Sequence, residues 1–175
     1  NSVLKDGKID LTDIGLAEED IRRTSQIYIV ACGSAYHVGM VAQYVIEDLV
    51  KIPVRVELAS EFRYRKPILD PNGLVIIISQ SGETADSLAA LRETKAQGIR
   101  TLGIVNVVGS SIAREADKVF YTLAGPEISV ATTKAYSTQL MASYILAIQF
   151  AKVKNTITEE QYENYIAELQ AIPEK

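Results

Sequence analysis

Short runs of β-branched and other apolar residues recur along the chain at regular intervals, separated by stretches of mixed polarity. The runs that begin at Ile27 and Leu74 are almost continuously apolar, which is typical of strands buried on both faces of a parallel sheet. The pattern predicts five strands: Gln26–Ala31, Val54–Leu58, Leu74–Ser79, Arg100–Asn106 and Lys118–Leu123.

Helical spacing of apolar residues fills the stretches between and after these runs, and Gly98 marks one of the helix ends. Strands that alternate with helices predict βαβ crossovers and an α/β fold. We therefore expect a three-layer αβα sandwich whose five parallel strands take the flavodoxin-like order 2-1-3-4-5. The predicted helices are Tyr36–Val50, a short one around Glu61, Ala85–Gln97, a brief turn at Ser111–Ala116, Thr132–Val153 and Thr158–Leu169.

Small polar residues follow the predicted strands at the edge where ligands bind in such sheets. In the order 2-1-3-4-5, the first and third strands lie side by side, and their carboxyl ends form the crevice of the topological switch point. The first strand leads into Cys32–His37 and the third into Ser79–Thr84, and the segments 106–111 and 129–133 join the same rim. We expect these loops to converge on one site.

The turn Ser79-Gln-Ser-Gly-Glu-Thr84 stands directly before a predicted helix. Free N–H groups and the helix dipole favour an anion at such a position, and hydroxyls and amides bind phosphate and sugar oxygens. The turn has no lysine, so it is not a nucleotide-hydrolysing P-loop. Ser79, Ser81 or Thr84 could each be a simple helix cap, but three hydroxyls with Gln80 exceed what one helix start needs. Gly33, Ser34 and Ala35 would form the second wall.

Composition narrows the classes of function. The 175 residues suit one domain, and a formal charge of −4 argues against nucleic-acid binding. The only cysteine, Cys32, excludes an internal disulfide and favours a reducing cytoplasm. We expect neither a membrane helix, which needs about 20 apolar residues, nor a signal peptide. The chain starts at Asn1 instead of Met, which indicates processing or an excised fragment.

Candidate catalytic groups are scarce. Cys32 is interpreted as a packing residue more readily than as a nucleophile, and the only histidine, His37, has no partner at metal-ligand spacing. The segment 129–158 contains no Asp or Glu, which leaves Glu83 and Glu127 as the carboxylates near the crevice. Because aldose–ketose isomerisation needs a group that moves a proton, this chain is better suited to holding a sugar phosphate than to converting one. We expect no catalytic residue, cofactor or metal.

Five stretches distributed along residues 21–151 resemble the sugar isomerase (SIS) domain family. More narrowly, they are similar to the first of two SIS lobes in glutamine–fructose-6-phosphate aminotransferases. The Ser-x-Ser-Gly-Glu-Thr turn marks SIS domains in general, whereas the full set in this order is specific to the aminotransferases. The stretches are Ile27–Met40, Ala59–Arg65, Ser79–Leu88, Asn106–Ser111 and Ala124–Tyr136.

The resemblance implies a family reaction in which fructose 6-phosphate and glutamine give glucosamine 6-phosphate and glutamate, within hexosamine biosynthesis. Ser79, Gln80, Ser81 and Thr84 match the phosphate-binding positions of the family, while Ser34, Ala35, Val130 and Thr132 match other sugar-contacting positions. The family usually has Cys-Gly-Thr-Ser where this chain has Cys32-Gly-Ser-Ala. Ser34 keeps a hydroxyl oxygen, but Ala35 has none for a side-chain contact.

The resemblance also implies a division of the chain into a lead-in segment (1–20), a SIS domain (21–153) and a C-terminal helix (154–175) that leads toward an absent second lobe. The glutaminase nucleophile, isomerase base, Schiff-base lysine and ring-opening histidine of the family have no counterpart here, so the isolated chain should be inactive. We expect two copies to pair as a homodimer. Two alternatives remain open: a regulatory sugar-phosphate-binding SIS module, and a complete small isomerase that uses Glu83 or Glu127 as its base.

Overall fold

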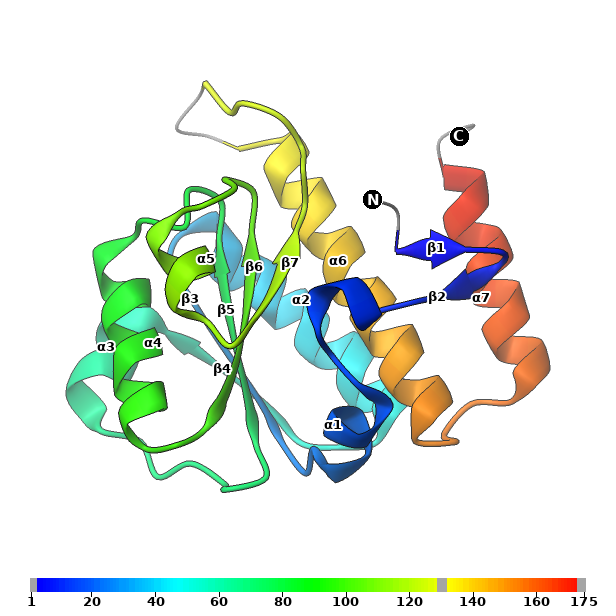
Figure 1. Ribbon diagram of the computed structural model, residues 1–175, viewed down its shortest axis with the longest axis horizontal. Helices are drawn as coiled ribbons and strands as arrows, with labels where there is room; N and C mark the ends of the chain where they lie inside the picture. Colours follow the sequence, from blue (N-terminus) through cyan, green and yellow to red (C-terminus); the bar gives the residue numbers. More distant parts are fainter. Residues whose placement is uncertain (1–2, 129–131, 173–175) are drawn as a thin grey trace.

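The computed structural model describes residues 3–128 and 132–172 and contains a five-stranded parallel sheet at its centre (Figure 1). The strand order is β4-β3-β5-β6-β7, which is the predicted order 2-1-3-4-5. The expected α/β fold and the expected strand order are therefore confirmed. The strands are β3 (Ile27–Ala31), β4 (Val54–Leu58), β5 (Leu74–Ser79), β6 (Arg100–Val105) and β7 (Lys118–Tyr121).

Alternation along the central strands divides the core into two layers. In β5, Leu74, Ile76 and Ile78 pack into the cluster that includes α2 and α6, whereas Val75 and Ile77 pack into the cluster that includes α3 and α4. All six residues of β5 are buried, which explains why its sequence shows no polar face. The sheet is thus covered on both faces, and the loops at the carboxyl ends of its strands form the exposed edge.

The helices follow the predicted positions closely and form the two outer layers seen in Figure 1. One layer contains α3, α4 and α5, and the other contains α2, α6 and the short α1. Three predicted helix starts differ: α2 begins two residues earlier, at Ser34, α6 begins at Lys134 instead of Thr132, and α7 begins at Glu159 instead of Thr158. The helices are α1 (Glu18–Arg23), α2 (Ser34–Val50), α3 (Ala59–Arg65), α4 (Ala85–Ala96), α5 (Ser111–Glu115), α6 (Lys134–Val153) and α7 (Glu159–Ala171).

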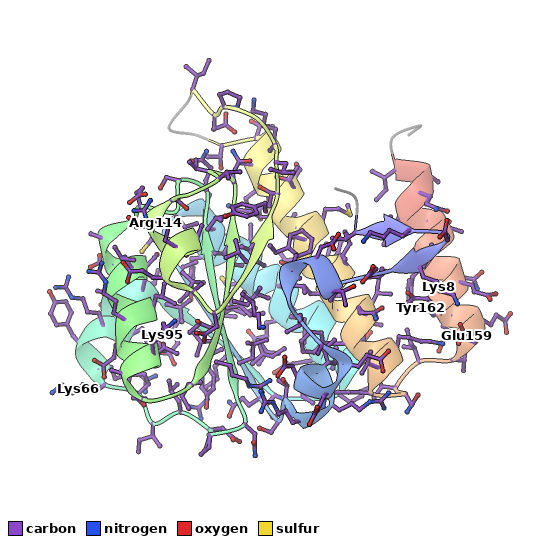
Figure 2. All side chains as sticks on the ribbon, viewed as in Figure 1. Lys8, Lys66, Lys95, Arg114, Glu159 and Tyr162 are labelled. Atoms are coloured by element: carbon purple, nitrogen blue, oxygen red, sulfur yellow. The ribbon has the colours of Figure 1, made fainter. Side chains whose placement is uncertain are left out.

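The two ends of the chain meet on the outer side of α6 (Figure 1). The first residues form an antiparallel hairpin, β1 (Leu4–Lys5) and β2 (Lys8–Ile9), followed by a 3₁₀ turn, η1 (Thr12–Ile14). Ile9, Leu11 and Leu16 from this segment and Tyr162 and Ile166 from α7 belong to the same core cluster as α2 and α6. Tyr162 is labelled on α7 in Figure 2 and accepts a hydrogen bond from the backbone N–H of Ile9 at 2.8 Å.

Within residues 3–128 and 132–172, none of the helices combines the length and the apolar character needed to cross a membrane.

Candidate functional site

A cavity of about 400 Å³ opens where β3 and β5 end and α2 and α6 begin. Its position is the switch point of the sheet, between neighbouring strands whose connections leave in opposite directions. Seven of the nine residues proposed from the sequence line it, and they come from three separate segments. The lining residues are Cys32, Ser34, Ala35, Ile78, Ser79, Gln80, Ser81, Thr84, Thr132 and Gln139.

The hydroxyls of the 79–84 turn are arranged by bonds within the turn. Ser79 Oγ lies 3.1 Å from Thr84 Oγ1 and accepts the N–H of Gly82 at 3.1 Å, while Ser81 Oγ accepts the N–H of Glu83 at 3.2 Å. Thr84 occupies the N-cap position of α4, yet its side chain makes no capping bond. The hydroxyls of Ser81 and Thr84 therefore line the cavity together with the open N-terminus of α4, a combination suited to an anion.

Gly82 allows this turn to lie directly against α5. Its φ of +66° favours glycine, and an added Cβ would lie 2.0 Å from Ser110 Oγ. The carbonyl of Gly82 also accepts the N–H of Ile112 at 3.0 Å. Ser110 itself is 3% exposed, and its hydroxyl has no partner among the described residues. The back of the turn is thus packed tightly on the start of α5.

Glu83 strengthens the same contact. Its Oε1 accepts the N–H of Ser111, the first residue of α5, at 2.7 Å. These hydrogen bonds from Ser111 hold the pKa of the Glu83 carboxyl below its ordinary value, and the positive charge of Arg114 acts in the same direction. A carboxylate held in its ionised form by a helix N-terminus is poorly suited to taking up a proton.

The second wall of the cavity is the first turn of α2. Gly33 does not line the cavity but adopts a φ of +56° directly before the helix, with open space around it. Its role is therefore conformational, because it turns the chain from β3 into α2. Ser34 and Ala35 then occupy the first turn of the helix and line the cavity.

Asn106 supports the rim without lining the cavity. Its backbone N–H donates to the carbonyl of Gln80 at 3.1 Å, which ties the end of β6 to the turn. Its side chain donates to the carbonyl of Gly125 at 2.7 Å and accepts the N–H of Ala124 at 2.7 Å. The loop that leads to the third wall is therefore held by one buried amide.

The third wall comes from the start of α6. Thr132 lines the cavity as expected, whereas Val130 lies outside the described residues. Gln139, which sequence reasoning did not propose, also lines the cavity and is only 3% exposed. The sequence does contain a sign of this position, because a polar residue lies at 139 between Ala135 and Ala142 on the buried face of the helix.

The described lining residues include no Asp, Glu, Lys or Arg, so the site offers neutral groups and backbone dipoles only. Glu127, the other candidate base, accepts the N–H of Ala135 at 3.4 Å near the start of α6 and is absent from the lining. Lys134 is exposed and also outside it. Among the described residues, no group of three or more His, Cys, Asp or Glu side chains could hold a metal ion.

Cys32 and His37, the two residues considered as a nucleophile and a metal ligand, lie in different environments. The half-buried thiol of Cys32 lines the cavity, and the hydroxyl of Ser87 approaches its Sγ at 4.0 Å. His37 is exposed and packs edge-on against Tyr36, outside the cavity lining. A larger depression of about 530 Å³ follows the outer edge of β7 and does not include the hydroxyl-rich turn.

Comparison with known proteins agrees with this geometry. The sequence profile of the SIS domain family matches residues 20–149, which include the whole sheet and every described wall of the cavity. The chain belongs to the SIS domain family. The resemblance noted from the Ser79–Thr84 turn and the other stretches is therefore confirmed at the level of the family.

Individual SIS relatives carry the similarity further. The chain is 57% identical to glutamine–fructose-6-phosphate aminotransferase from Clostridium tetani over 98% of its residues, and 58% identical to that of Clostridium acetobutylicum over 95%. It spans 28% of the length of each of these curated relatives. The solved C-terminal domain of glucosamine–fructose-6-phosphate aminotransferase from Francisella tularensis superimposes with a TM-score of 0.91 at 48% identity, covering 97% of this chain and 47% of that one.

Proposed function

We propose that this chain is the first, sugar-phosphate-binding SIS lobe of a glutamine–fructose-6-phosphate aminotransferase, in the pathway to hexosamines. Fructose 6-phosphate, or its product glucosamine 6-phosphate, would lie with its phosphate on the 79–84 turn. The remainder of the sugar would extend toward Ser34, Ala35, Val130 and Thr132. Chemistry would be carried out by parts of the longer protein that this chain does not contain.

The observation that carries this proposal is the cavity formed by the turn and the starts of α2 and α6. It presents hydroxyls and an open helix N-terminus and has no charged side chain in its described lining. Such a site can hold a phosphate through short hydrogen bonds and the helix dipole. The identity of 57% to an aminotransferase supports the choice of ligand.

The alternative of a complete small isomerase is less well supported. Its two candidate bases, Glu83 and Glu127, both accept backbone N–H groups at the starts of helices and are absent from the cavity lining. Turnover of fructose 6-phosphate by this chain alone, abolished in Glu127→Gln, would favour that alternative. A regulatory module would be indicated if the parent gene encoded a DNA-binding domain upstream and no glutaminase.

Calorimetric titration with fructose 6-phosphate tests the proposal. Ser81→Ala and Thr84→Ala each remove one hydrogen bond to a charged group, worth about 1.5–3 kcal/mol, so Kd should rise roughly tenfold or more. Ser137→Ala is the control, because that hydroxyl bonds the carbonyl of Thr133 on its own helix and lies outside the cavity lining. Equal affinities in all four chains would contradict the site.

Three further expectations belong to the same proposal. Pairing of two copies into a homodimer is testable by sedimentation velocity over a range of concentrations. A cytoplasmic location is supported by the single free thiol of Cys32. The proposed boundaries of the SIS domain, at residues 21 and 153, can be checked by limited proteolysis.

A further inference from the structure

Gln139 occupies a position on the buried face of α6, which is otherwise apolar except for Ser143. Ala135, Gln139, Ala142 and Leu146 follow the helical spacing of the buried face, and each of them is at most 3% exposed. An aliphatic residue at position 139 would continue this face without a polar group. The chain places a primary amide there instead, and that amide lines the cavity of the candidate site.

The Gln139 side chain has no hydrogen-bond partner among the described residues, although its backbone carbonyl accepts the hydroxyl of Ser143 at 2.9 Å. Two half-buried glutamines away from the cavity are paired within the fold. Gln43 donates to the carbonyl of Val54 at 2.8 Å, and Gln149 accepts the hydroxyl of Tyr162. Ser110 Oγ, and not the Gln139 amide, is the fully buried side-chain polar atom without a partner in the described part of the chain, so the amide is accessible from the cavity that it lines. It can therefore bond a group that enters the cavity.

We propose that Gln139 is a specificity-determining residue that hydrogen-bonds the sugar part of the bound sugar phosphate. This inference rests on the proposed function, which assigns the phosphate to the 79–84 turn. A primary amide provides two N–H donors and one carbonyl oxygen acceptor. It can therefore hydrogen-bond a hydroxyl or a carbonyl oxygen of a sugar. A buried amide of this kind also disfavours ligands that leave it unpaired.

The placement of Gln139 separates its role from that of the turn. The 79–84 turn belongs to β5 and α4, whereas Gln139 lies in the second turn of α6, on a different wall of the cavity. Its amide carries no net charge, so it offers little to an isolated phosphate ion. A ligand with a sugar and a ligand without one should therefore respond differently to its removal.

The experiment measures Kd for fructose 6-phosphate and for inorganic phosphate in the parent chain, Gln139→Leu, Gln139→Met and Thr84→Ala. In both Gln139 variants, Kd for fructose 6-phosphate should rise at least fivefold, and Kd for inorganic phosphate should change less than twofold. In Thr84→Ala, Kd should rise for both ligands. Unchanged fructose 6-phosphate affinity in the two Gln139 variants, with Thr84→Ala still weakened, would overturn this inference and leave the proposed function standing.

Other outcomes separate the two proposals. No effect of Thr84→Ala on either ligand would contradict the proposed function itself, and equal weakening of both ligands in the Gln139 variants would indicate a purely structural role. A measurement on the parent chain avoids any folding defect of the variants. The NMR signals of the Gln139 side-chain NH₂ should shift with fructose 6-phosphate and not with inorganic phosphate, and identical responses would overturn the inference.

Discussion

At the residue scale, the three hydroxyl residues of the 79–84 turn both line the cavity and form hydrogen bonds within the turn. Ser79 is the most buried of them, at 3% exposed, and organises the turn through Gly82 and Thr84. Helix capping would have explained one such residue, but the Thr84 side chain caps nothing. The excess of hydroxyls that marked this turn in the sequence thus corresponds to hydroxyls that support the turn and line the cavity.

Gly82 is the residue of the turn least tolerant of a side chain. Gly82→Ala combines a φ of +66° with contacts of 2.0 and 2.6 Å to Ser110, and it should lower the free energy of unfolding by about 2–4 kcal/mol. Urea denaturation measures the loss. Gly98→Ala is the matched control, since φ is +73° and nothing lies within 4 Å, so about 1 kcal/mol is expected. Ser110→Gly should partly rescue Gly82→Ala, and a Gly82→Ala loss no greater than the control's would contradict the argument.

Glu83 should make stability depend on pH. The pKa of its carboxyl is lowered in the folded chain, mainly by hydrogen bonds from Ser111. Its contribution is therefore complete above the ordinary value of 4.5 and disappears as the pH falls through the lowered one. Glu83→Gln should reduce the urea midpoint at pH 7, and the difference from the parent chain should shrink as the pH falls below 4.5.

The control for this titration is Glu163→Gln, which removes one charge from the exposed surface of α7. Its difference from the parent chain should stay small between pH 3 and pH 7. A Glu83→Gln difference that is equally large at both ends of the range would show that the carboxylate charge does not hold α5 against the turn.

At the scale of elements, periodicity predicted most of the architecture correctly. All five strands of the sheet and the six later helices lie where the pattern placed them, and the ends for which bounds were predicted differ by at most two residues. The hairpin and α1 were not predicted. Strands of two residues and a helix of six are too short to show a period, and they are stabilised by packing of Ile9, Leu11 and Ile21 on the core.

The hydroxyl of Tyr162 links α7 to the hairpin through a buried hydrogen bond. Tyr162→Phe would leave the buried N–H of Ile9 without its 2.8 Å acceptor, which should cost about 1–3 kcal/mol. Hydrogen exchange at the Ile9 amide should accelerate, and urea denaturation should report the loss. Tyr165→Phe is the control on the same helix, because its hydroxyl has no hydrogen bond in the described part of the chain. Equal exchange rates in the two variants would refute this account.

At the scale of the whole molecule, the fold gathers three chain segments around one cavity and keeps the carboxylates of Glu83 and Glu127 out of its lining. Glu83 and Glu127 both bind backbone N–H groups near helix starts, at α5 and α6 respectively. The absence of acidic residues from 129–158 had already indicated this separation. A lobe that holds a substrate and leaves proton transfer to other parts of a longer protein is consistent with both observations.

The sequence by itself determined the fold class, the strand order and the main turn of the site, because these depend on local periodicity and on which strand ends share an edge. It also pointed to Ser34, Ala35 and Thr132, which line the cavity. Only the tertiary structure decided the partner of Glu83 and the position of Gln139. Ser111, which donates to Glu83, is distant in the chain, and Gln139 reaches the cavity from another wall, so both placements exist only after the layers have packed.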